Sequence, residues 1–392
     1  MKKYYIEDIS GKVENYDLAL YDAIKKEAND ASVKFFAPGY GLLSLIPKRW
    51  QHSNDIIKRL VKVAEGLLNY AYTCIKVACD KPDVLHLQWL PFMEVVGWEI
   101  PILKFIKRIS PKTRLVLTIH NIYPHNMSSE RKKAYNARFR KASSLFDDFI
   151  VHTKISKEDV FREFGLRAEK VHVCCHGVFE PKGVTISLEY RKDGKLHILQ
   201  FGGQSFYKGT DLLVDAVCGL DDERKKRIET HIVGGISQSF LDELKKKDVD
   251  SVIAWKAYFL SDEELYQEIN AADLIVLPYR AISQSGVLLL SIFFGKLIIC
   301  SDLPSFMETM RGEEGNGLDN DMFFKNEDAE SLRELIVRYI DGKVDEEAVR
   351  KRVNHIKSLN SWQSAAKATI KVYEGEVQNS WADSNNLGES LE

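Results

Sequence analysis

The sequence lacks any apolar run long enough to cross a bilayer. No stretch of the 392 residues reaches the roughly 18 apolar residues of a spanning helix. The first five residues, Met1 to Tyr5, lead into acidic residues rather than into an apolar signal region. We therefore expect a cytoplasmic protein.

Cysteine is scarce, and its spacing does not suit a metal. The six cysteines are Cys74, Cys79, Cys174, Cys175, Cys218 and Cys300. Cys74 and Cys79 are separated by four residues and Cys174 and Cys175 are adjacent, so neither pair has metal-ligand spacing. No Asp-x-Asp pair follows an expected strand. We expect buried free thiols and no metal site.

Net charge is also low, although its distribution is uneven. Hydrophobic residues make up 45% of the chain and charged residues 29%, a composition that excludes a disordered or fibrous protein. The net charge is −2, with +8 over residues 1–180 and −10 over residues 181–392. A basic N-terminal half suits an anionic surface or acceptor, and a solvated basic face explains it equally well.

Strand-like runs alternate with longer amphipathic stretches, which predicts parallel α/β layers. The chain is too long for one core of ordinary size, so we expect two Rossmann-like domains. The expected strands are 33–36, 84–88, 114–120, 148–152 and 171–175, then 195–201, 231–233, 251–254, 274–277 and 297–300.

Polar residues around Pro181 and Gly194 indicate a linker between these domains. We expect an N-terminal domain over 1–180, a linker over 181–194 and a C-terminal domain over 195–360. The last helix, 361–376, should pack back on the first domain, and the polar residues 378–392 should be a disordered tail.

Ligands of open α/β sheets bind outside the carboxyl ends of the strands, so the loops there carry the functional prediction. The strand ending at Phe201 runs into Gly202 and Gly203, and Lys208 follows just before the next helix. Glycines that admit backbone to a ligand, with a lysine at a helix N-terminus, suit a phosphate. A tight strand-to-helix turn is an equally good explanation of the two glycines.

A second such loop follows the strand ending at Leu277. It presents Ser285, Gly286 and the amide of Val287 at the start of an apolar helix, where unpaired N–H groups point outward. This is a second candidate anion site. Ser285 can also serve only as an N-cap.

Together these segments resemble the donor half of family 4 retaining glycosyltransferases with the GT-B fold. The motifs are Phe201-Gly202-x-x-x-x-Tyr207-Lys208-Gly209, Ile232-Val233-Gly234-Gly235, Leu277-Pro278-Tyr279-Arg280, Gln284-Ser285-Gly286-Val287 and Phe294-Gly295-Lys296. The similarity is greatest to the branch with a Gln-Ser-Gly-Val loop, and it continues through 83–89, 117–125 and 361–374. It implies two Rossmann-like domains that face each other across a cleft.

The sequence departs from this family at three positions. The family's two glutamates would fall at Ile282 and Leu290, and the basic residue of the first loop is replaced by Ser205. Lys208 is then the clearest positive charge for a diphosphate. Arg280 can substitute, or can equally form an ion pair.

The resemblance implies the following site residues. The donor site comprises Gly202, Gly203, Ser205, Lys208, Arg280, Gln284, Ser285, Gly286 and Val287, and the acceptor side comprises Asn15, Tyr16, Trp89, Asn121 and His125. His120, at the end of a strongly apolar strand, is the candidate catalytic residue in the cleft. For His86, His152 and His176 we favour packing roles.

The implied function is retaining transfer of a sugar from a nucleotide diphosphate sugar to a glycan or lipid-linked acceptor, in bacterial polysaccharide assembly. The leaving phosphate would help to take the acceptor proton. The nucleotide diphosphate sugar would be a co-substrate, and we expect no cofactor and no metal, because amides and a lysine can stabilise the phosphate. Two alternatives remain open: an enzyme like the nucleotide-sugar 2-epimerases, and a non-catalytic partner subunit. We expect no nucleic-acid partner.

Basic residues cluster after the His120 loop and on the preceding helix. They are Arg131, Lys132, Lys133, Arg138, Arg140 and Lys141, with Lys104, Lys107, Arg108 and Lys112. Such a face suits peripheral docking on an anionic membrane, and a solvated helix is the alternative.

Overall fold

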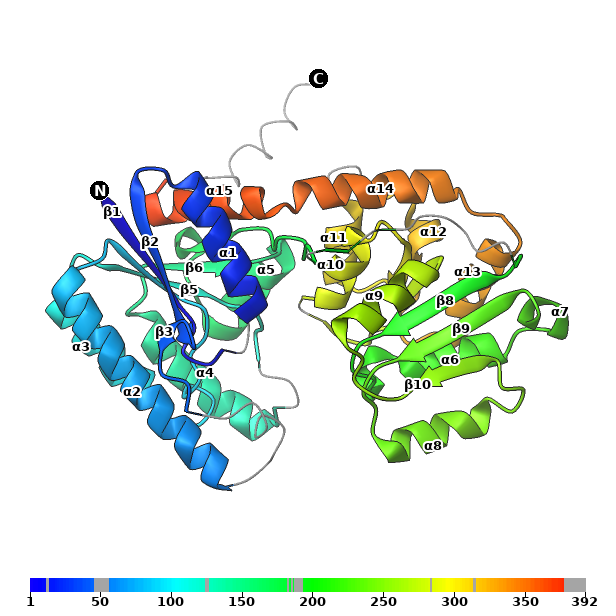
Figure 1. Ribbon diagram of the computed structural model, residues 1–392, viewed down its shortest axis with the longest axis horizontal. Coiled ribbons are helices and arrows are strands. Elements are labelled where there is room, and N and C mark those ends of the chain that lie inside the picture. The colour runs from blue at the N-terminus through cyan, green and yellow to red at the C-terminus, as the bar shows by residue number, and fades with distance from the viewer. Residues whose placement is uncertain are drawn as a thin grey trace, which may run out of the picture. The chain divides into compact units, whose positions relative to one another are not determined.

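The computed structural model describes residues 1–11, 14–45, 56–123, 127–181, 183–184, 186, 193–282, 284–312 and 315–376. His125, most of the expected linker and the tail 378–392 lie outside these residues. The chain divides into two compact units, Met1–Gly177 with Trp362–Glu392, and Val178–Ser361. The expected pair of parallel α/β units is confirmed (Figure 1).

The first unit contains a parallel sheet in the order β3-β2-β1-β4-β5-β6-β7. Its strands are β1 (Lys2–Glu7), β2 (Ala31–Pro38), β3 (Gly41–Leu42), β4 (Val84–Leu87), β5 (Arg114–Thr118), β6 (Asp148–Val151) and β7 (Val171–Val173). β4 and β6 are buried along their whole length, as expected for strands covered on both faces.

Helices flank the strands of this sheet. They are α1 (Glu14–Glu27), α2 (Ile56–Asp80), α3 (Glu99–Ile109), α4 (Ser129–Ser143), α5 (Lys154–Phe164), the short η2 (Ala168–Lys170) and α15 (Trp362–Glu374). Thr153 caps α5 by accepting from the Ser156 amide, and Gly165 ends it in the left-handed conformation. α15 packs against α1, and their shared core contains Tyr4, Tyr16 and Tyr373.

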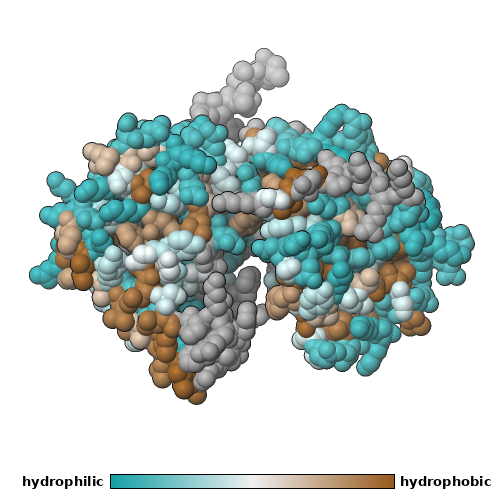
Figure 2. Space-filling model, in the orientation of Figure 1, coloured by the Kyte–Doolittle hydropathy of each residue, from teal (hydrophilic) through white to brown (hydrophobic). Residues whose placement is uncertain are grey.

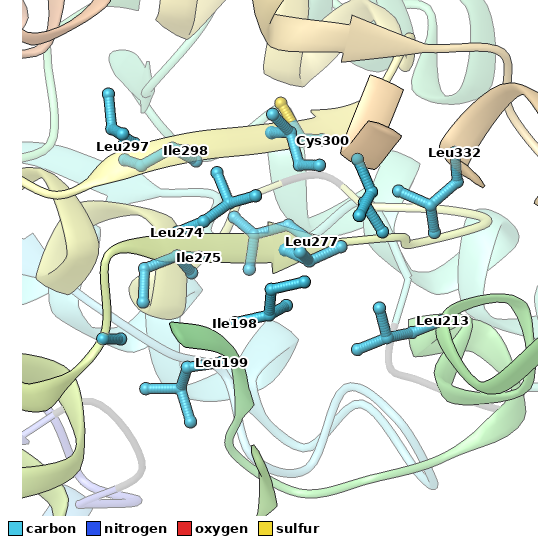
Figure 3. Close-up of a cluster of buried hydrophobic side chains, with 14 of the residues drawn as sticks. Ile198, Leu199, Leu213, Leu274, Ile275, Leu277, Leu297, Ile298, Cys300 and Leu332 are labelled. Atoms are coloured by element: carbon cyan, nitrogen blue, oxygen red, sulfur yellow. The ribbon is translucent and has the colours of Figure 1, made fainter. Parts of the chain in front are cut away.

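The second unit contains a parallel sheet in the order β10-β9-β8-β11-β12-β13. Its strands are β8 (Leu196–Phe201), β9 (Ile228–Val233), β10 (Ile253–Lys256), β11 (Leu274–Leu277), β12 (Leu297–Ser301) and β13 (Phe323–Phe324). Figure 3 shows side chains from β8, β11 and β12 packing together, with Leu213 and Leu332 from flanking helices. This rigid core fixes the loops at the strand ends.

The helices of the second unit are η3 (Phe206–Lys208), α6 (Thr210–Cys218), α7 (Asp222–Lys225), α8 (Gln238–Lys247), α9 (Asp262–Ala271), α10 (Gly286–Phe293), α11 (Pro304–Arg311), α12 (Asp319–Met322), α13 (Ala329–Ile340) and α14 (Glu346–Leu359). Six of them, α7, α8, α9, α10, α13 and α14, begin at a residue whose side chain caps the helix. Ser261 and Glu264 form a capping box on α9.

One strand of the first sheet was not expected from the sequence. β1 pairs with both β2 and β4 inside the first sheet, whereas the first strand that we expected was 33–36. No helix among the described residues combines the length and the apolarity needed to cross a membrane.

Candidate functional site: two loops of the second unit and a pocket of the first

The loop between β8 and α6 depends on its glycines. Gly202 has φ +99 and Gly209 has φ +64, a region that other residues rarely adopt. A Cβ on Gly209 would lie 1.7 Å from the Pro278 carbonyl oxygen, so only glycine lets this loop approach the end of β11 so closely. The backbone is therefore shaped here by contact with the second loop.

The second loop presents the N-terminus of α10. The buried Ser285 caps this helix, since its Oγ accepts from the Leu288 amide at 3.1 Å. Within the described residues, the amides of Gly286 and Val287 have no hydrogen-bond acceptor. Gly286 is exposed, and a Cβ there would meet only the Phe179 ring at 3.5 Å. Free amides at an open helix N-terminus favour an anion.

The two loops meet at Lys208. A Cβ on Gly202 would lie 3.2 Å from Lys208 Nζ and 3.3 Å from Val287 Cγ2. Burial lowers the pKa of Lys208 to about 8. Its Nζ lies 5.1 Å from the ring centroid of Tyr279, and among the described residues no carboxylate or hydrogen-bond acceptor pairs with it. A half-buried ammonium without an anionic partner is suited to receive one.

The Arg280 side chain is bonded to other residues of the second unit. Its two terminal nitrogens each lie 2.8 Å from an oxygen of Asp211. It also donates to the Phe206 carbonyl at 2.6 Å and stacks on the Phe206 ring. Of the two possibilities left open by the sequence, the structure contains the ion pair, which ties the two loops together.

Two residues of these loops, Gln204 and Tyr279, were not among the predicted site residues. Gln204 donates to the carbonyls of Gly202 and Val233 and accepts from Thr210, so it fixes the first loop from within. Tyr279 supplies the ring beneath Lys208. In the sequence, the glutamine directly after two glycines was the feature that could have indicated a side chain holding this loop by hydrogen bonds.

The other candidate donor residues differ in how far they are buried. Gly203 is exposed, Gln284 is half-buried, and Ser205 Oγ is buried without a hydrogen-bond partner among the described residues. Ile282 and Leu290, where the family has glutamates, are half-buried and pack against the core of the unit. They therefore serve packing in this chain.

In the first unit, Trp89, His120 and Asn121 line one pocket. Glu94 and the α4 residue Tyr135 also line it. Trp89 follows β4, and His120 and Asn121 follow β5, at the strand ends where ligands of parallel sheets bind. Two of the residues predicted for the acceptor side, Trp89 and Asn121, thus lie together with the candidate catalytic residue His120.

His120 belongs to a cluster of aromatic rings. Its Nε2 lies 3.3 Å from Gln88 Oε1, and its Nδ1 lies 3.4 Å from His152 Nε2. Burial lowers the pKa of His120 well below its ordinary value, and nearby His152 and His176 add to this effect. His120 is therefore neutral at pH 7, and it can exchange hydrogen bonds but carries no charge.

Tyr16 lies at the centre of this cluster rather than on an open surface. It is 4% exposed, and its ring contacts those of His120, His176 and Trp362. Asn15 is exposed at the start of α1, and His125 lies outside the described residues. Tyr16 can therefore position His120, whereas Asn15 is free to contact a ligand.

One group of side chains in the described part of the chain has the donors for a cation. Ligand atoms of Asp193, His197 and Glu229 lie within 4.8 Å of one another. They surround the first residues of β8 and β9, at the sheet edge opposite to the donor loops. Each acidic side chain already lies near an imidazole, with 2.9 Å from Asp193 to His197 and 3.0 Å from Glu229 to His231.

Comparisons with known proteins agree with this geometry. The "Glycosyl transferases group 1" model matches residues 195–341, and the "Glycosyltransferase Family 4" model matches residues 27–179. The chain therefore belongs to the group 1 and family 4 glycosyltransferases.

A curated relative is the GDP-mannose:glycolipid 4-beta-D-mannosyltransferase of Xanthomonas campestris. It is 23% identical over 227 residues, which cover 55% of this chain. The match spans 60% of that relative's own length.

Solved structures share the whole fold. HepE of Anabaena, crystallised with UDP, has a TM-score of 0.65 at 16% identity and covers 95% of this chain and 100% of its own. WaaG, a glycosyltransferase involved in lipopolysaccharide biosynthesis, has a TM-score of 0.63 at 13% identity and covers 96% and 100%. At these identities the likeness establishes the GT-B fold.

Proposed function

We propose that this chain transfers a sugar from a nucleotide diphosphate sugar to a glycan or lipid-linked acceptor, in bacterial polysaccharide assembly. The second unit would hold the donor and the first unit the acceptor. One observation carries the proposal: the unpaired, half-buried Lys208 lies beside the turn at Gly202 and the open N-terminus of α10. The UDP in HepE and the glycolipid in the name of the Xanthomonas relative support this assignment.

The chemistry follows from the charge that develops on the leaving group. Cleavage of the sugar–phosphate bond leaves negative charge on the diphosphate and oxocarbenium character on the sugar. Lys208 and the amides of Gly286 and Val287 would stabilise that charge without a metal, because they are oriented before the reaction begins. His120, neutral at pH 7, would donate a hydrogen bond to the sugar or the diphosphate.

The stereochemistry of the transfer has two candidate outcomes. The family resemblance implies retention, in which the leaving phosphate takes the acceptor proton on the same face. Inversion is the second candidate, because Ile282 and Leu290 replace the family's carboxylates and the relative's name specifies a β-mannosyl linkage. A β product formed from an α-linked donor requires inversion, with a base on the acceptor side such as Glu94. Proton NMR of the product's anomeric coupling distinguishes the two.

The donor is tested by thermal shift with UDP-, GDP- and ADP-sugars, since a ligand that binds the native state raises its apparent stability. A shift with one of these nucleotides, retained with its nucleoside diphosphate alone, supports the proposal. If no nucleotide raises the melting temperature and no nucleoside diphosphate binds in isothermal titration, the result favours the non-catalytic partner subunit. Donor consumption without any acceptor indicates an enzyme like the epimerases.

A further inference from the structure

The outward face of α2 (Ile56–Asp80) is apolar. Its inward face carries the buried residues Asn69, Tyr70 and Val77. On the solvent side, Leu60, Leu68 and Ile75 are 65%, 51% and 62% exposed. A surface helix of a soluble protein normally places polar residues there. At 1.5 Å per residue, the exposed stripe from Leu60 to Ile75 extends for about 20 Å.

Apolar exposure continues onto the neighbouring helix. α3 (Glu99–Ile109) packs beside α2, and Phe105 on it is 51% exposed. Trp98, directly before α3, is 41% exposed. We call Leu60, Leu67, Leu68, Ile75, Trp98 and Phe105 the α2 surface. Figure 2 shows hydrophobic side chains gathered along α2.

Among the described residues, the exposed charged side chains of α2 and α3 are basic. Arg59 and Lys62 on α2 and Lys104 and Arg108 on α3 are exposed. The acidic residues of these two helices are withdrawn: Glu65 and Glu99 are buried, and Asp80 pairs with Lys34. On these two helices, as far as the structure describes them, the surface therefore combines exposed apolar side chains with exposed basic ones.

We propose that the α2 surface docks on an anionic lipid bilayer, with α2 lying in the plane of the interface. Apolar side chains would enter the boundary between headgroups and acyl chains, while the basic residues meet anionic headgroups. A second copy of the chain fits less well, because it would bring the same positive charges together. The proposal rests on a lipid-linked acceptor, which a docked enzyme would reach without leaving the membrane.

The basic stretch on α4 (Ser129–Ser143) lacks this combination. Arg138 donates to the carbonyls of Met93 and Glu94, and Arg140 donates to the Glu163 carbonyl. The interleaved Phe139 is 2% exposed, so α4 offers charge without an exposed large apolar side chain. We therefore assign docking to the α2 surface instead of the α4 stretch.

The test is co-sedimentation of the full chain with vesicles of phosphatidylcholine and phosphatidylglycerol. The variant Leu60→Gln/Leu68→Gln/Ile75→Gln should bind at least about tenfold more weakly than the wild type. The control Val249→Gln/Phe259→Gln removes apolar residues that are 82% and 83% exposed in the second unit, and it should bind normally. Unchanged thermal unfolding in both variants shows that they fold.

Three results would overturn the proposal: no wild-type binding at low salt, equal binding to pure phosphatidylcholine, or equal loss in both variants. A dimer in analytical ultracentrifugation that the triple variant abolishes, with no vesicle binding, would identify a second copy as the occupant. Nucleotide binding is measured separately on the same variants. Failure of docking with intact nucleotide binding leaves the proposed transfer standing, and the reverse result leaves the docking surface standing.

Discussion

Lys208→Met should have opposite effects on ligand binding and on stability. In the free protein the burial that lowers the pKa of Lys208 to about 8 opposes its charge. The fall from the ordinary value of 10.5 to about 8, at about 1.4 kcal/mol per pKa unit, corresponds to a cost of about 3 kcal/mol for the charge at pH 7. Methionine keeps the length of the side chain without the charge, so the variant should be more stable by this order.

The pH window of this gain follows from the two pKa values. The unfolded chain holds the Lys208 proton up to about pH 10.5 and the native state only up to about pH 8, so native stability rises between these values. The advantage of Lys208→Met should therefore be complete below pH 8 and vanish by about pH 10.5. Urea titrations at pH 7 and pH 10 measure it.

Nucleoside diphosphate binding should change in the other direction. A charge-assisted hydrogen bond contributes about 1.5 to 3 kcal/mol, so Lys208→Met should weaken binding by about 10- to 150-fold in isothermal titration. Between pH 7 and pH 9 the wild-type affinity should fall by about tenfold as Lys208 loses its proton, and the variant should show no such fall.

Lys296→Met is the matched control. Burial also lowers the pKa of Lys296 to about 8, and its Nζ donates to the Asn270 carbonyl at 2.8 Å. It lies just before β12, away from the donor loops, so its replacement should leave nucleotide affinity unchanged. Equal affinity in Lys208→Met and wild type at pH 7 would refute the assignment of Lys208.

Three further substitutions probe the rest of the site. His120→Asn should slow sugar transfer at least about tenfold with little change in melting temperature. Because His120 is neutral, its titration should not contribute to the pH dependence of the wild-type rate between pH 6 and pH 7, so wild type and variant should have the same pH profile there. Equal loss of rate and stability would contradict a role in the site. Arg280→Lys should destabilise the second unit by about 1 kcal/mol, since a lysine cannot replace both bonds to Asp211, and a double-mutant cycle with Asp211→Asn that shows no coupling would exclude the tie. Gly286→Val should fold, because a Cβ has room there, yet bind nucleotide more weakly than Ser285→Ala, which loses only about 1 kcal/mol of helix capping; the opposite order of affinities would argue against phosphate contact at Gly286.

The sequence predicted the α/β class because buried parallel strands appear as short apolar runs separated by helical spacing. β1 was missed since Lys2 and Lys3 precede its apolar residues, and its central place depends on pairing with Ala31–Phe36 and Val84–Leu87 far along the chain. Strand ends were also shifted: β10 is Ile253–Lys256 where 251–254 was expected, because Asp248 accepts from the amides of Val252 and Ile253 and delays the strand.

The candidate site was predictable only in its loops. Glycine and lysine spacing predicted Gly202 and Lys208, and the polar loop before an apolar helix predicted Ser285. The partner of Arg280 could not be predicted from the sequence, because Asp211 is 69 residues away. Likewise, the membrane-docking prediction for α4 rested only on its basic residues in the sequence. The side-chain exposures in the structure distinguish α4, which exposes no large apolar side chain, from the apolar α2 surface.

A crystal structure of the chain grown with GDP or UDP tests the central claim most directly. We expect diphosphate oxygens within about 3 Å of Lys208 Nζ and of the Gly286 and Val287 amides, the distance of a charge-assisted hydrogen bond. A diphosphate bound elsewhere, such as beside His197 and Glu229 at the opposite edge of the same sheet, would contradict the account.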